Sequence, residues 1–119
     1  FHQTVTTPLN QAQIAFAPSP GNHDASAFAA FQQERAEYQL TFISRSPLPG
    51  LGKFELLEGS NFPFHYAFLL KGALFIALDA TTVGLPDAAQ MEWLKTTLAA
   101  HQKVPLKVVY GHVPLYPYS

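Results

Sequence analysis

The sequence predicts a mixed α/β fold with a single core. Two observations support this prediction: some segments rich in branched and aromatic residues have the length of strands, and other segments carry apolar residues at helical spacing. The chain has 119 residues, of which 48% are hydrophobic, which is enough for one modest core but not for two. The expected order is strand, helix, hairpin, helix and strand.

The first expected strand covers residues 14–17 and stops at the segment PSPG, residues 18–21. Proline fixes φ and glycine tolerates unusual backbone angles, so this cluster ends a strand in a tight turn. The GNHD loop, which comprises residues 21–24, is therefore expected at the carboxyl end of a strand.

A helix is expected over residues 25–40, which are rich in the helix-favouring residues Ala, Gln, Glu and Arg. Phe28, Phe31 and Tyr38 fall roughly on one face of this helix. Residues 46–63 then carry several prolines and glycines with little periodicity, which predicts a long irregular excursion over the surface.

A buried β-hairpin is expected from two apolar runs, residues 64–70 and 73–78, because only Lys71 and Gly72 separate them. Two residues are the length of a tight hairpin turn, and glycine supplies the positive φ that such a turn requires. The aromatic side chains of this region are expected in the core. A base-stacking platform would lie beside several basic residues, and here Lys71 alone is near.

The last helix is expected after Asp87, since apolar residues follow it at helical spacing. Gln90 stands three residues after Asp87, which is the spacing of a capping box. A short strand over residues 107–110 comes next and runs directly into Gly111 and His112.

Charge and composition exclude several classes of site and partner. Seven basic against eight acidic residues give a formal charge of −1, so no basic surplus favours a nucleic-acid backbone. The chain has no cysteine, so any metal must be bound by nitrogen and oxygen ligands. The longest apolar run, residues 67–78, is interrupted by Lys71 and Gly72 and is too short to span a membrane. The sequence indicates no oligomeric state.

Two loops that follow expected strands carry residues able to bind a metal. Asn22 offers a neutral oxygen and His112 an imidazole nitrogen, which together make half of a site for a transition metal. Because the carboxyl ends of strands in an α/β sheet lie at one edge, the two loops are expected to converge. His23 is better placed beside such a metal, where it could protonate a leaving group, while Asp24 would fix the tautomer of its ring.

Two motifs, PGNHD at residues 20–24 and VYGHVPLY at residues 109–116, follow the expected strands. They resemble the Gly-Asn-His-Asp/Glu motif and the later Gly-His motif of the calcineurin-like metallophosphoesterases, in particular the purple-acid-phosphatase-like branch. Residues 75–79 and 90–94, FIALD and QMEWL, are similar to a strand and the following helix of that branch. The resemblance spans about residues 14–116.

By that resemblance, the chain would form part of a layered α/β/β/α sandwich with a mixed sheet and would hydrolyse phosphomonoesters or phosphodiesters. The family uses two transition-metal ions, of the Fe, Mn or Zn kind, and a metal-bound hydroxide that attacks the phosphorus of a small-molecule phosphate ester. Asn22 and His112 would be metal ligands, and His23 with Asp24 would be the catalytic pair.

Other motifs of the family are missing. The sequence contains no Asp-x-His and no Gly-Asp-x-x-Asp, and Pro114 stands where the Gly-His motif would need a second histidine. Since the missing motifs lie before and after those present, residues 1–119 are expected to be the central part of one metallophosphoesterase domain, truncated at both ends. The activity would belong to the longer parent chain, and the isolated chain would bind metal weakly. Family analogy slightly favours a periplasmic or secreted parent.

Simpler interpretations of the same residues stay open. Asp24 could be only a helix N-cap next to His23 in a turn, and His112 could simply end a strand. Asp79 lies near the same edge and is expected to form local hydrogen bonds rather than to belong to the site. At the level of function, the alternatives are a non-catalytic scaffold or binding module that keeps the fold, and a nuclease of the same family.

Overall fold

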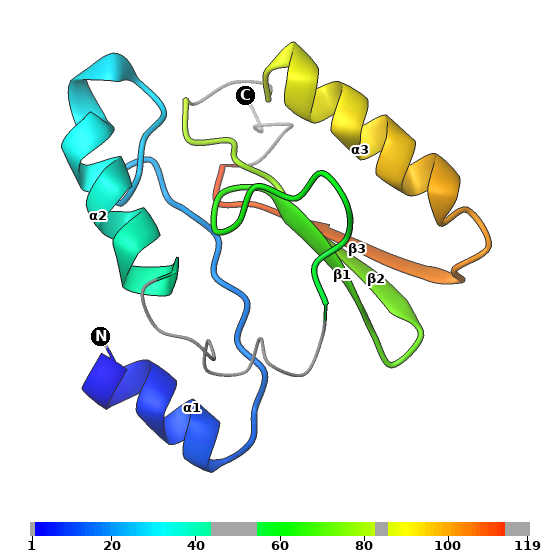
Figure 1. The fold of residues 1–119 in the computed structure, drawn as a ribbon, viewed down its shortest axis with the longest axis horizontal. Helices are drawn as coiled ribbons and strands as arrows, with labels where there is room; N and C mark the ends of the chain where they lie inside the picture. Colours follow the sequence, from blue (N-terminus) through cyan, green and yellow to red (C-terminus); the bar gives the residue numbers. More distant parts are fainter. Residues whose placement is uncertain (1, 44–54, 83–85, 114–119) are drawn as a thin grey trace, which may run out of the picture.

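The computed structural model describes residues 2–43, 55–82 and 86–113. Within these ranges, three strands form one mixed sheet in the order β1-β2-β3, with helices around it (Figure 1). The strands are β1 (Tyr66–Leu70), β2 (Ala73–Ala77) and β3 (Leu106–Tyr110), and the α-helices are α1 (Thr7–Gln11), α2 (Gln32–Ile43) and α3 (Ala88–Ala100). The mixed α/β class is confirmed, while the α/β/β/α sandwich stays a prediction.

β1 and β2 form the expected hairpin, in which Tyr66 lies opposite Ala77 in an antiparallel register. The turn consists of Lys71 and Gly72, with φ values of 50° and 80°. Positive φ at both central residues is typical of the tight turn whose twist matches the twist of the flanking strands.

α3 provides the crossover between β2 and β3, which run parallel. The helix begins as expected, because the Asp87 carboxylate accepts a hydrogen bond of 2.8 Å from the backbone N–H of Gln90. The capping box is only half formed. The Gln90 side chain instead accepts from the N–H of Asp79 and donates to its C=O, since these backbone groups lie beyond the paired part of β2.

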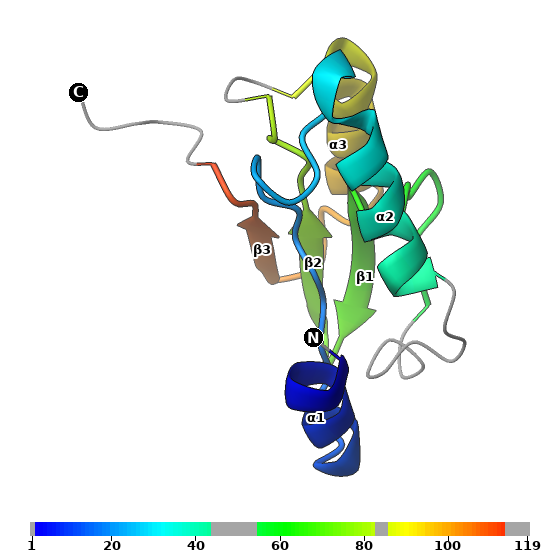
Figure 2. The ribbon, with the colours of Figure 1, turned by 90° about the vertical axis from the view of Figure 1, so that its left-hand side faces the viewer.

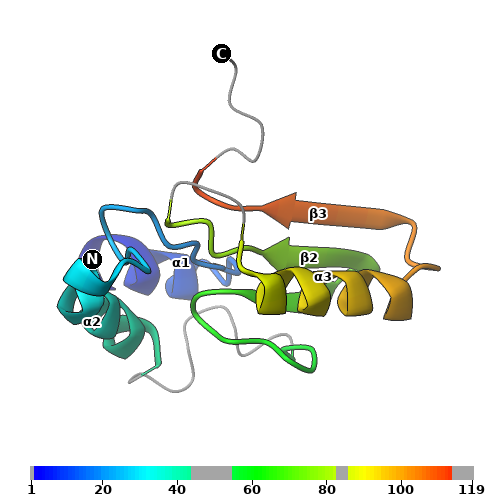
Figure 3. The same ribbon diagram turned by 90° about the horizontal axis from the view of Figure 1, so that it is seen from above.

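α3 covers one face of the sheet (Figure 3). The core on that side comprises four buried residues and the apolar side chains packed against them: Ala67, Leu74, Ile76 and Leu78, with Leu57, Trp93, Leu94, Leu98 and Val104. The opposite face carries Tyr66, Phe68 and Ala77, and Ala17 packs there from residues 14–20, which cross in front of the sheet in Figure 2. The aromatic residues of the hairpin are therefore core residues, as expected.

The strand expected at residues 14–17 is wrong, because residues 14–20 are irregular and pair with no strand. Pro18 and Pro20 have no N–H to donate to a ladder, which disfavours pairing of this segment. The chain before it forms a π-helical turn, His2–Thr6, and α1. The GNHD loop thus follows a covering segment and not a strand.

The helix expected over residues 25–40 begins later and ends later. A 3₁₀ turn, Ala29–Phe31, leads into α2, which extends to Ile43. Phe28 and Phe31 are exposed, so they do not share the packed face on which Tyr38 is half-buried. Side-chain contacts hold residues 25–27 outside the helix: the N–H of Ala27 donates to the distant Thr81 hydroxyl, and Arg35 of α2 donates to the carbonyl oxygen of Ala25.

The irregular excursion expected over residues 46–63 falls partly outside the described residues, which resume at 55. The described part, 55–63, has only isolated bridges to β1 and its approach, between Leu56 and Phe68 and between Asn61 and His65. Residues 114–116 of the second motif, Pro114 among them, also lie outside the described residues.

Candidate functional site

Two loops meet where β2 and β3 end, on the side toward which both strands point in Figure 3. One is the GNHD loop and the other is Gly111-His112, which directly follows β3. A chain of buried hydroxyl groups links the residues that precede the two loops. The Tyr110 hydroxyl donates to the Tyr66 hydroxyl at 3.3 Å, and the Tyr66 hydroxyl donates to the carbonyl oxygen of Pro18.

Burial raises the pKa of the Tyr66 and Tyr110 hydroxyls above the usual value of a tyrosine. For Tyr66, the neighbouring Tyr110 raises the pKa further. Both groups therefore stay protonated at neutral pH and can act as donors in this chain. Three segments far apart in the sequence are held together by it: the approach to the GNHD loop, β1 and β3.

The GNHD loop is a tight turn closed on Gly21. The carbonyl oxygen of Gly21 accepts hydrogen bonds from the N–H of Asp24 at 3.0 Å and of Ala25 at 2.9 Å. Gly21 itself is buried, while the side chains of His23 and Asp24 are exposed and Asn22 is half-buried. The turn thus presents three polar side chains on a fixed backbone.

Gly21 brings the two loops together because it has no side chain. A Cβ at this position would lie 2.5 Å from Oδ2 of Asp24 and 3.4 Å from Nε2 of His112. The Asp24 carboxylate and the His112 ring therefore lie within about 6 Å of each other, the sum of these two distances. The φ of Gly21 is not positive, so glycine is needed here for close approach and not for its backbone freedom.

The structure thus brings Gly21, Asp24 and His112 together across 91 positions of sequence. Asn22 and His23 belong to the same turn, but within the described part of the chain neither side chain makes a hydrogen bond or ion pair. The Asp24 carboxylate likewise makes no hydrogen bond to the His23 ring in that part. Metal binding by Asn22 and His112 and catalysis by His23 and Asp24 stay predictions.

A polar network of Arg35, Asp79 and Thr81 lies next to the residues that follow the GNHD loop. It was not expected to belong to the site. Asp79, two residues beyond β2, forms an ion pair of 2.5 Å with Arg35 of α2, and the two side chains are 8% and 17% exposed. The same guanidinium donates to the carbonyl oxygen of Ala25 at 2.9 Å and stacks on the ring of Phe64, 3.7 Å from its centroid. Arg35 therefore connects the end of β2 to the residue that follows the GNHD loop.

Thr81 completes this network on the other side. Its hydroxyl donates to the Asp79 carboxylate at 2.7 Å and accepts from the N–H of Ala27 at 3.0 Å. Ser26 is buried beside it and donates to the Thr81 carbonyl oxygen at 3.4 Å. Asp79 thus positions residues 25–27, which directly follow the GNHD loop. The local hydrogen bonds expected of it are present, but its partner Arg35 lies 44 positions away.

The chemistry of the donors present suits a transition metal, since an amide oxygen and an imidazole nitrogen are ordinary ligands of Fe, Mn and Zn. Their number is insufficient. Across residues 2–43, 55–82 and 86–113, no three His, Cys, Asp or Glu side chains form a group that could hold a metal ion. The described residues fit one part of a coordination sphere at most.

Searches against profiles of protein families, curated proteins and solved structures find no significant match to this chain. None of the helices that the structure describes is long and apolar enough to cross a membrane.

Proposed function

We propose that these residues belong to a metal-dependent phosphoesterase whose activity resides in a longer chain. One observation carries the proposal: the ring of His112, in one motif, lies against Gly21, in the other. Two motifs that resemble one family and also meet in space are better explained by a shared site than by two unrelated turns.

In this proposal, Asn22 and His112 would hold one of two transition-metal ions, and the remaining ligands would come from the rest of the longer chain. Such ions supply a water of lowered pKa and neutralise charge on phosphoryl oxygens. His23 is exposed on the turn, where its ring could donate a proton to the oxygen of the leaving alcohol. Gly21 leaves the space in which the Asp24 carboxylate and the His112 ring approach each other.

Zinc titration of the 119-residue chain, followed by nuclear magnetic resonance, tests the shared site. The Asn22 amide and the His112 ring are expected to respond together, with weak affinity because few ligands are present. His101 is the matched control, since its ring is hydrogen-bonded to the carbonyl oxygen of Thr97 at the distant end of α3. An equal response of His101 and His112, or no response of either at millimolar zinc, would contradict the shared metal site.

The catalytic role is tested in a longer chain that contains these residues. It should bind two transition-metal ions and hydrolyse a chromogenic aryl phosphate, and His23→Ala should lower turnover about 100-fold or more with metal content retained. Loss of metal in His23→Ala would instead make His23 a ligand. A longer chain with neither metal nor phosphatase activity would leave a scaffold of the same fold as the explanation.

A further inference from the structure

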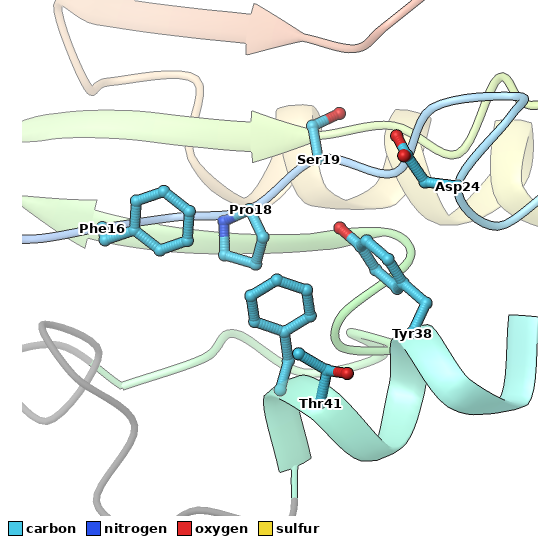
Figure 4. Close-up of a pocket in the computed structure, with 7 residues that line it drawn as sticks. Phe16, Pro18, Ser19, Asp24, Tyr38 and Thr41 are labelled. Carbon is cyan, nitrogen blue, oxygen red and sulfur yellow. The ribbon is translucent and has the colours of Figure 1, made fainter. Parts of the chain in front are cut away.

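A pocket that shares Asp24 with the GNHD loop opens between residues 16–19 and α2 (Figure 4). Its volume is about 300 Å3, at the lower end of the range for small-molecule sites. The polar side chains of Ser19, Asp24 and Tyr38 lie toward one end in Figure 4, and the ring of Phe16 lies at the other. The pocket therefore has one polar and one apolar end.

Two hydroxyl groups at the polar end lack the partners that buried polar atoms normally have. The hydroxyl oxygens of Ser19 and Tyr38 are both shielded from solvent, and neither forms a hydrogen bond to any described residue. Burying a hydroxyl without a partner is unfavourable, and such groups are rare in folded proteins. A ligand that hydrogen-bonds to both would remove this cost once the Ser19 side chain rotates and the Tyr38 ring shifts slightly toward the pocket.

Among the described residues that line this pocket, Asp24 alone carries a charged side chain. The nearby cation, Arg35, is already engaged by Asp79 and by the carbonyl oxygen of Ala25. Burial, and after it the charge of Asp24, raises the pKa of Tyr38, so its hydroxyl stays neutral. Among the described side chains, the polar end thus carries one negative charge and three groups whose oxygens accept hydrogen bonds: the Asp24 carboxylate and the Ser19 and Tyr38 hydroxyls.

We propose that this pocket binds a small organic cation, a protonated amine on a compact apolar body. An ammonium group has three N–H donors and no acceptor, which matches the carboxylate of Asp24 and the hydroxyl oxygens of Ser19 and Tyr38. The apolar body would lie toward Phe16 and Phe42. An anion would meet the Asp24 charge, and a neutral alcohol offers only one donor.

Binding of 2-phenylethylammonium and of the neutral 2-phenylethanol to the 119-residue chain, measured by nuclear magnetic resonance titration, tests the proposal. The two probes share an aromatic body and differ in the charged group. The cation is expected to bind with a dissociation constant of about 1 mM, as suits nine heavy atoms, and at least about 5-fold more tightly than the alcohol. Shifts should occur at Ser19, Asp24 and Tyr38.

Variants separate the charge from the shape of the pocket. Asp24→Asn keeps the size of the side chain and should bring the affinity for the cation down to that for the alcohol. Tyr38→Phe keeps the ring and should weaken cation binding about 3-fold. Glu92→Gln removes an exposed carboxylate on α3 and should change nothing, and the dispersion of the spectra shows that each variant is folded.

Any one of three results would overturn the proposal. The two probes could bind with equal affinity, or Asp24→Asn could leave cation binding unchanged. The third is no binding of the cation at a concentration on the order of 20 mM, which is 20-fold the expected dissociation constant. The inference does not depend on phosphoester hydrolysis. His112→Gln should abolish the zinc response of the loops and leave amine binding intact, so failure of one proposal is distinguishable from failure of the other.

Discussion

The two ends of β2 differ in how the chain builds them. The hairpin turn before β2 depends on the adjacent residues Lys71 and Gly72, and α3 packs on Leu74 and Ile76 along the strand by simple burial. The loop end depends on polar contacts between distant segments, with 44 to 55 positions between partners such as Arg35 and Asp79 or Ser26 and Thr81.

Because of this difference, the stability of the fold and the geometry of the site depend on different sets of residues. Buried apolar residues stabilise the fold in proportion to the surface removed from water. The polar contacts add less to stability, but they determine where Asp24 and His112 lie. Substitutions in the two regions should therefore have different signatures, and the following ones are chosen to break or sharpen the contrast.

The largest effect is expected in the core under α3. Ile76→Ala should lower the free energy of unfolding by about 3 kcal/mol, because the Ile76 side chain is fully buried and its truncation leaves a cavity. Urea denaturation followed by circular dichroism measures this change. The same truncation at exposed Ile14 is the matched control and should stay within about 0.5 kcal/mol. Similar losses at both positions would mean that this face is not the main source of stability.

Breaking the ion pair between Asp79 and Arg35 is expected to lower stability and also to loosen the residues that follow the GNHD loop. Asp79→Ala leaves the Arg35 guanidinium largely buried without its carboxylate and should cost about 2 kcal/mol. It should also speed hydrogen exchange at the amide of Ala27, whose acceptor Thr81 is held by Asp79. Glu92→Gln, which breaks the exposed pair with Lys95, is the control and should change neither quantity. A loss of stability with unchanged exchange would show that Asp79 does not position the loop.

Two glycines offer a direct contrast between the regions. Gly72→Ala should cost about 1 kcal/mol, because φ at this position is 80° although nothing lies within 4 Å of a Cβ there. Gly21→Ala should cost less than about 0.5 kcal/mol, since the exposed Asp24 carboxylate can swing away from the new methyl group.

The two substitutions should rank in the opposite order in their effect on the resonances of the loop end. Gly21→Ala is expected to shift the resonances of Asp24 and His112, and Gly72→Ala is expected to leave both unchanged, as measured by nuclear magnetic resonance. If Gly21→Ala left the His112 ring unperturbed, the proximity of the two loops in solution would be refuted.

The smallest effect concerns His65, which packs against Trp93 with ring centroids 4.8 Å apart. Burial lowers the pKa of His65, so the unfolded chain binds more protons than the folded chain as pH falls below about 6.5. Stability should therefore decrease slightly between pH 7.5 and pH 5.5, as measured by urea midpoints. His65→Gln should have a flatter dependence, and an equally steep one would assign the effect to another group.

The sequence alone determined the parts of this protein that rest on local rules. The hairpin was predictable because two residues with one glycine admit few turns, and the start of α3 because Asp87 can cap only the helix that follows it. The approach of the two loops was expected because both motifs were placed after strands, but only His112 follows one, since residues 14–17 form no strand. Their residues were chosen by family resemblance, and their metal and catalytic roles stay predictions.

Only the tertiary structure decided what the polar side chains at the loop end contact. Gln90 has the spacing of a capping box but bonds to the backbone of Asp79, and residues 25–27 have helical composition but are held by Arg35 and Thr81. No local pattern identifies these partners, which lie 11, 10 and 54 positions away. The cause is physical: a buried polar group must find a hydrogen-bond partner, and the packing of distant elements determines which partner is within reach.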